Sequence, residues 1–349
     1  MNRSMPNSVL GLDVGGANLK ASDGGRYSRA AFFPLWKSPE GLAAAVAELV
    51  ADAPPCSTWA VTMTGELADC FRTKREGVAA ILNAVEVAAS RRSLPPRVCV
   101  YLTDGTFVSP EQARSLPLAA AASNWHALAA FTARRFPEVR GLLMDIGSTT
   151  SDLIPFSGGV PTAIGRTDPE RLASGELVYT GVVRSPVCAL VQALPWRGAV
   201  CGVAQELFAT SLDAYLVLGL LAEDADDRNT ADGRPATIEF AHDRLARCIC
   251  ADRELFDAAD ARAAAAEIRA AQVRLIAAAW ARCMARGASP QVVVVAGQGE
   301  FLARALLRDV GFDGRVVSLA AEFGEEASRV GPAYALACIA GEEFVEWRS

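Results

Sequence analysis

The chain has 349 residues, with 34 Lys and Arg against 40 Asp and Glu and only 2 His, so its formal net charge at pH 7 is -6. This length exceeds what one hydrophobic core usually supports, so we expect two lobes. The acidic balance argues against a nucleic-acid or anionic-membrane binder, and two widely separated histidines exclude a His-rich metal centre.

The first part of the chain predicts strands and helices in alternation. A buried strand over 9–13 ends in Asp13 and is followed by Gly15 and Gly16, which is typical of a strand that enters a tight turn. The remaining predicted elements are hairpin strands over 17–22 and 26–33, a helix over 39–51, a strand over 58–64, a helix over 73–89, a strand over 97–102, and a helix over 123–136 that Ser123 would cap.

The opening pattern then returns about 130 residues later. A strand over 139–146 carries Asp145 and is followed by Gly147, Ser148, Thr149 and Thr150, and by a second strand over 151–156. This internal echo predicts two related lobes, residues 1–138 and 139–349. Later come an insertion over about 185–250 with a loop over 222–236, a helix over 253–286, a strand over 291–296, a helix over 301–308, and a helix over 331–345 that packs back toward the first lobe.

Three glycine-containing turns carry the chemistry. Gly15, Gly16 and Asn18 follow the first strand, and glycines there leave backbone N–H groups free to hold phosphate oxygens. Lys20 adds a positive charge, and an aspartate at a strand end holds a cation that neutralises the same phosphates. The alternative interpretation of this segment is an ordinary hairpin turn.

The second turn offers a glycine and three hydroxyls, Gly147 to Thr150, which predict phosphate contacts; its alternative is a turn that satisfies its own backbone. The third places Gly297 and Gly299 between a buried strand and a helix N-terminus, which is typical of an anion site. Its alternative is a close strand-to-helix turn.

Together, the three turns resemble those of the acetate and sugar kinase, heat-shock-70 and actin superfamily, in which two phosphate loops face each other across a cleft. The resemblance covers essentially the whole chain. It implies an α/β, two-lobed, actin-like ATPase fold with a central cleft.

Less generic strings resemble the hydantoinase/oxoprolinase-like proteins linked to tetrahydromethanopterin one-carbon transfer and methanofuran biosynthesis. They lie at residues 13–20, 63–69, 123–126, 165–168, 175–181 and 230–236. This resemblance implies an enzyme that condenses (5-(aminomethyl)furan-3-yl)methyl diphosphate with γ-glutamyltyramine. An aryl ether forms and diphosphate leaves.

For such a reaction we predict Mg²⁺ held by Asp13, Asp145 and Asp152, because the protein is itself acidic and must neutralise a charged leaving group. Asp13, Glu66 and Asp104 are the predicted catalytic acids and bases, although helix-start or turn roles would also explain the last two. The predicted substrate-binding residues, which surface salt bridges would equally explain, are Arg166, Asp168, Tyr179 and Arg184.

Two other functions use the same cleft. One is an ATP-dependent small-molecule kinase or hydantoinase/oxoprolinase-type ATPase, and the other is a non-catalytic, actin-like nucleotide-binding protein. The expected partners are small molecules, without nucleic acid or membrane, and a homo-oligomer stays open. Nine cysteines without a CxxC pair, and no apolar run of the ~18 residues that a membrane span needs, indicate a cytoplasmic protein.

Overall fold

The computed structural model describes residues 8–287 and 289–346 and contains two six-stranded sheets and a small hairpin. The first sheet has the order β3-β2-β1-β4-β5-β6. Its strands are β1 (Val9–Val14), β2 (Asn18–Ser22), β3 (Ser28–Phe32), β4 (Thr58–Met63), β5 (Arg97–Tyr101) and β6 (Phe107–Val108). β1 to β3 pair antiparallel, whereas β4 and β5 continue parallel to β1.

The second sheet repeats this arrangement. Its order is β10-β8-β7-β13-β14, with β9 (Val160–Pro161) beside β8. The strands are β7 (Gly141–Ile146), β8 (Ser151–Ser157), β10 (Leu177–Val178), β13 (Val292–Ala296) and β14 (Arg315–Ser318). Again three strands pair antiparallel and two continue parallel. The same order and the same directions in both sheets confirm the predicted two-lobed, actin-like α/β fold.

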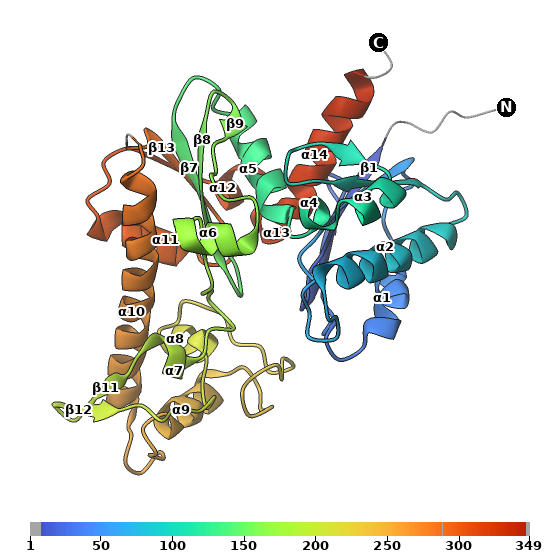
Figure 1. Ribbon diagram of the computed structural model, residues 1–349. Helices are drawn as coiled ribbons and strands as arrows, with labels where there is room; N and C mark the ends of the chain where they lie inside the picture. Colours follow the sequence, from blue (N-terminus) through green and yellow to red (C-terminus); the bar gives the residue numbers. More distant parts are fainter. Residues whose placement is uncertain (1–7, 288, 347–349) are drawn as a thin grey trace.

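Two helices lie between the sheets, α5 (Asn124–Arg134) and α14 (Gly331–Glu346) (Figure 1). One core joins their apolar side chains to those of both sheets. α14 approaches β1 so closely that a Cβ on Gly11 would overlap the Ala333 carbonyl oxygen and lie 2.9 Å from the Ala337 nitrogen. The C-terminal helix therefore packs against the first sheet.

The outer faces carry the other helices. η1 (Pro39–Gly41), α1 (Leu42–Leu49), α2 (Lys74–Ser90), α3 (Pro110–Ser115) and α4 (Pro117–Ala120) belong to the first sheet's side. The second sheet packs against the later part of α10 (Ala258–Met284) and α11 (Glu300–Asp309). The connections between these elements contain three short helices, α6 (Asp168–Ser174), α12 (Leu319–Phe323) and α13 (Glu325–Arg329).

Ser123 does not cap α5 as expected. Its backbone is helical, with φ -86° and ψ -3°, and its side chain makes no cap hydrogen bond. The hydroxyl instead donates to the Tyr101 carbonyl at 2.9 Å and lies 2.7 Å from Thr62 Oγ1. The expected capping serine thus ties the start of α5 to β4 and β5.

The insertion forms its own apolar core at the first part of α10. It contains α7 (Val187–Leu190), the hairpin β11 (Ala193–Trp196) and β12 (Ala199–Gly202), α8 (Ser211–Val217) and α9 (Ile238–Arg247). α10 starts later than predicted because Asp257 caps it by accepting hydrogen bonds from the Ala259 and Asp260 amides. No helix in the described ranges is long and apolar enough to cross a membrane.

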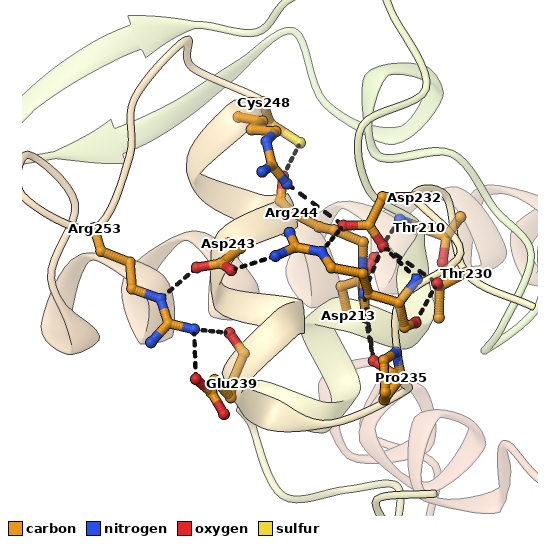
Figure 2. A network of polar contacts seen from close by, with 12 residues as sticks. Thr210, Asp213, Thr230, Asp232, Pro235, Glu239, Asp243, Arg244, Cys248 and Arg253 are labelled. Atoms are coloured by element: carbon orange, nitrogen blue, oxygen red, sulfur yellow. Dashed lines mark hydrogen bonds and ion pairs between the residues drawn. The ribbon is translucent and has the colours of Figure 1, made fainter. Parts of the chain in front are cut away.

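A buried arginine anchors the loop over 222–236, which has no helix or strand. Arg244 lies between Asp213 and Asp232, at 2.8 and 3.0 Å (Figure 2). Asp232 also pairs with Arg234, at 2.7 Å. The predicted loop is therefore mostly exposed but fastened at its C-terminal end.

Candidate active site

Two aspartates lie on the inner faces of the two sheets. Alternate side chains of a strand point to opposite faces. In β1, Leu12 and Val14 belong to the core under α1 and α2, so Asp13 points inward. In β7, Met144 and Ile146 belong to the core on α10 and α11, so Asp145 also points inward.

Asp13 is 3% exposed and only half satisfied. Lys20, its directly opposite neighbour in β2, places Nζ 3.6 Å from Oδ2. Oδ1 has no hydrogen-bond partner within the described chain. Burial raises the pKa of the Asp13 carboxyl, and Lys20 opposes that rise only in part. A buried carboxylate oxygen without a partner is a fitting ligand for a cation.

Asp145 is the counterpart of Asp13 in the second lobe. Burial raises the pKa of Asp145 to about 7, the nearby Asp152 carboxylate adds to the rise, and Lys20 opposes it. Asp13 also contributes to this increase. Lys20 therefore lies within electrostatic reach of acids from both lobes.

The first glycine turn is held in place by the segment after β4. The Gly15 amide donates to the Asn18 carbonyl at 3.0 Å, and the Thr64 and Gly65 amides both donate to the Val14 carbonyl. A Cβ on Gly65 would lie 3.1 Å from the Gly15 carbonyl oxygen. The Gly16 amide donates to no acceptor in the described part of the chain, so it is free to bind an anion.

The second turn is fastened by residues 181–184. The Val182 amide donates to the Gly147 carbonyl, and the Val183 and Arg184 amides donate to the Ser148 carbonyl, each at 3.0 Å. A Cβ on Gly181 would lie 2.6 Å from the Gly147 oxygen. The Ser148 amide itself donates to no acceptor in the residues described, and is thus available for an anion.

A buried polar network supports this fastening segment. Gln272 of α10 donates to Thr180 Oγ1 at 2.7 Å and to the Gly181 carbonyl at 2.8 Å. Ser211 of α8 also donates to the Gly181 carbonyl, at 2.8 Å. Sequence reasoning missed both residues. The string over 175–181 pointed only to the segment that they contact.

The third turn packs against the end of β7. Gly297 has φ +79°, and a Cβ there would lie 2.5 Å from Asp145 Oδ1. The Gly299 amide donates to the Ile146 carbonyl at 2.9 Å, as a close strand-to-helix turn requires. Gly297 thus lets the chain pass directly beside the Asp145 carboxylate.

A chain of ion pairs crosses between the lobes. Lys74 of α2 lies 3.4 Å from Glu66 Oε1 and 2.9 Å from Asp168 Oδ2 of α6. Arg171 then joins Asp168, at 3.7 Å, to Asp152. Sequence reasoning missed Lys74 and Arg171. Asp152, the third predicted metal ligand, is thus already paired with a guanidinium group, whereas Asp13 and Asp145 are not.

Glu66 is the most buried of the predicted catalytic acids, at 1% exposed. Its Oε2 has no hydrogen-bond partner in the described residues. Burial raises the pKa of Glu66, while Lys74 opposes the rise. The carboxylate is therefore a stronger base than an exposed one.

The other predicted residues lie in two places. Asp104 and Arg166 line a groove of about 390 Å³. Although burial raises the pKa of Asp104, hydrogen bonds from Thr106 outweigh that effect and hold the pKa below its ordinary value. The guanidinium carbon of Arg184 lies 5.0 Å from the ring centroid of Trp36 in the first lobe. Tyr179 is 71% exposed.

Among the described residues, no group of three or more His, Cys, Asp and Glu side chains is arranged to hold a metal ion. Asp13 and Asp145 nevertheless offer two carboxylates beside two phosphate-type turns. Mg²⁺ is commonly held by one or two carboxylates together with substrate phosphates. The donor set fits a cation that arrives with a phosphorylated ligand.

The sequence model of the hydantoinase/oxoprolinase family matches residues 57–339. A protein of Methanocaldococcus jannaschii named (4-{4-[2-(gamma-L-glutamylamino)ethyl]phenoxymethyl}furan-2-yl)methanamine synthase is 33% identical over 94% of this chain and 96% of its own. A protein of that name from Methanococcus vannielii is 27% identical over 58% of this chain and 91% of its own.

Among solved structures, nucleotide-free acetone carboxylase, described in connection with ATP-dependent acetone carboxylation, aligns with a TM-score of 0.57. The alignment covers 95% of this chain and 70% of that chain at 12% identity. At such low identity, this similarity shows the fold alone.

Proposed function

This chain belongs to the hydantoinase/oxoprolinase family, and from this premise we propose that it is a transferase of methanofuran biosynthesis. It joins (5-(aminomethyl)furan-3-yl)methyl diphosphate to the phenol of γ-glutamyltyramine, forming an aryl ether and releasing diphosphate. The observation that carries the proposal is the 33% identity, over 94% of the chain, to a synthase whose name describes a phenoxymethylfuran.

The reaction is an alkyl transfer. The phenol oxygen forms a bond to the methylene carbon of the furan, the bond from that carbon to the diphosphate oxygen breaks, and diphosphate leaves with the electron pair. The phenol proton goes to a base. The protein therefore has to collect negative charge on the leaving group and hold the phenol oxygen opposite it.

The two opposed turns suit the leaving group. The free amides of Gly16 and Ser148 donate to diphosphate oxygens from opposite lobes, and Lys20 places its charge between them. Asp13 and Asp145 would hold Mg²⁺, which neutralises diphosphate charge when it is bound. Asn18, Gly147, Thr149, Thr150, Gly297 and Gly299 complete the proposed turns.

Glu66 suits the base. Its buried carboxylate has one free oxygen, and Lys74 fixes the other. Asp104 is a weaker base because the hydrogen bonds from Thr106 lower its pKa. We therefore assign the phenol proton to Glu66 and a positioning role to Lys74.

The setting of the enzyme is part of the proposal. Its partners are small molecules, and its location is the cytoplasm, where nine free cysteines stay reduced.

Thermal-shift measurements test which ligand the cleft takes. We expect diphosphate with Mg²⁺ to raise the Tm of the protein and the Asp13→Asn variant to lose that rise. An exposed-site control, Asp309→Asn, retains it. Protection by ATP with none from diphosphate would contradict the proposal and favour an ATP-dependent enzyme or a nucleotide-binding protein.

A further inference from the structure

An open groove of about 390 Å³ lies between the two lobes. One wall comes from the end of β5 and the first turn of α5, with Tyr101, Trp125 and His126. The other wall comes from the segment 159–166 of the second lobe, which contributes Arg166. Both lobes therefore contribute to one binding surface.

The groove lies on the same face of the first sheet as Asp13. Thr62 is paired with Asp13 across β1 and β4. Tyr101 lies one strand further and belongs, with Ala60 and Cys99, to the core between the sheets. Two strand spacings of about 4.8 Å separate Tyr101 from Asp13, roughly 10 Å. An extended ligand longer than about 10 Å is long enough to span this separation.

Two opposite charges face this groove. Asp104 keeps a low pKa through its Thr106 hydrogen bonds, so it is ionised at neutral pH. The Arg166 guanidinium makes no ion pair or side-chain hydrogen bond within residues 8–287 and 289–346. Both charges act on His126, whose pKa burial lowers to about 4, with Asp104 opposing and Arg166 adding to the decrease.

The rest of the groove carries little net charge. His126 is neutral at pH 7, and its Nδ1 lies 2.9 Å from the Tyr101 hydroxyl. Arg134 pairs with Glu342 and Glu343, at 3.0 and 2.9 Å. One negative charge and one positive charge, neither of them in an ion pair within the described residues, thus face the groove.

We propose that this groove binds the zwitterionic α-amino-acid head of a γ-glutamyl compound, with Arg166 on the α-carboxylate and Asp104 on the α-ammonium group. The assignment rests on the proposed function, because the acceptor there carries a phenol at one end and this head at the other. A guanidinium binds a carboxylate through two parallel hydrogen bonds. Asp104 is then a substrate-binding residue and not the base.

The shape of the acceptor agrees with this placement. In γ-glutamyltyramine the ring, the ethyl linker, the amide and the glutamyl chain lie in series, so the phenol and the amino-acid head are far apart. With the phenol at the diphosphate site, the head reaches the groove. Val160, which is 56% exposed, and Pro161 offer apolar surface to the linker.

Isothermal titration calorimetry without the furan diphosphate tests the groove directly. We expect γ-glutamyltyramine to bind at least tenfold more tightly than tyramine. Arg166→Gln and Asp104→Asn each raise its Kd at least tenfold and leave the Kd of tyramine unchanged. Arg166→Lys retains part of the affinity. Exposed residues of α11 provide matched controls, Arg308→Gln and Asp309→Asn, which bind as the wild type does.

The failure of this assignment differs from failure of the proposed reaction. If both groove variants form the ether with wild-type KM, or bind γ-glutamyltyramine with wild-type Kd, the groove assignment is wrong and the reaction stands. If the head binds and depends on both residues but no ether forms, the groove stands and the reaction is wrong. If γ-glutamyltyramine binds no better than tyramine, the groove assignment falls.

Discussion

Gly297 gives the sharpest test of how the second lobe shapes the site. Its φ of +79° lies in the left-handed region, and a Cβ there would overlap the Ile146 carbonyl oxygen and lie 2.5 Å from Asp145 Oδ1. Gly297→Ala therefore has to strain the backbone and displace the Asp145 carboxylate. Gly311 isolates the first effect, because its φ is +64° and a Cβ there meets nothing within 4 Å.

The magnitudes follow from this pair. The left-handed conformation costs an L residue about 1–2 kcal/mol, so Gly311→Ala loses about that much stability and Gly297→Ala loses this and the cost of its overlaps. Only Gly297→Ala also disturbs Asp145, so its transition-state stabilisation falls by at least about 1.4 kcal/mol, a tenfold fall in kcat/KM. Gly311→Ala keeps wild-type kcat/KM.

Urea unfolding and steady-state ether formation measure these two quantities on the same preparations. We expect the Gly297→Ala variant to lose more stability than the Gly311→Ala variant. We also expect kcat/KM to fall in Gly297→Ala and to stay at the wild-type value in Gly311→Ala. Equal free energies of unfolding together with unchanged kcat/KM in both variants would refute the close approach of this turn to Asp145.

Other expected outcomes concern the acids, the insertion and a histidine. Asp13→Asn removes a partly unsatisfied buried carboxylate, so Tm stays level or rises while kcat falls at least about a hundredfold in steady-state assays; unchanged kcat would contradict the role of Asp13. Arg244→Met leaves Asp213 buried without its counter-charge, so we expect the free energy of unfolding measured in urea to fall by about 3–5 kcal/mol. For exposed Arg247→Met we expect a fall of less than about 0.5 kcal/mol. Equal losses would contradict the role of Arg244 in anchoring the loop. The pKa of His126 is about 4 in the folded protein and about 6.5 in the unfolded protein. Between these pH values the unfolded state therefore binds more protons. The contribution of neutral His126 to stability is fully present above pH 6.5 and is lost as the pH falls toward 4. Urea unfolding of wild type and His126→Gln over that window measures it, and a difference independent of pH would count against it.

The repeated strand, turn and strand units were predictable because their signals are local. An apolar run that ends in an aspartate and a glycine specifies a buried strand and a tight turn within ten residues. The outer helices were predictable for the same reason, because their apolar residues recur at helical spacing. α6 also had a local signal that was overlooked, the capping box of Thr167 and Glu170.

The chain of ion pairs between the lobes was beyond sequence reasoning. Lys74 and Asp168 are 94 positions apart and meet only after both sheets have formed and the lobes have packed. The same holds for Gln272, which supports the second turn from another helix 92 positions away from Thr180. Such contacts depend on tertiary packing, which no local pattern records.

The insertion illustrates the same limit. Its hairpin strands are four residues each and give a weak periodic signal. The loop over 222–236 is fixed by Arg244 from a later helix, so its composition alone indicated only a loop.

The most direct test of the central claim is mass spectrometry of the purified protein incubated with Mg²⁺, the furan diphosphate and γ-glutamyltyramine. The proposed reaction predicts one ether product for each diphosphate released, without ATP. Failure to form the ether while the protein binds and hydrolyses ATP would contradict it.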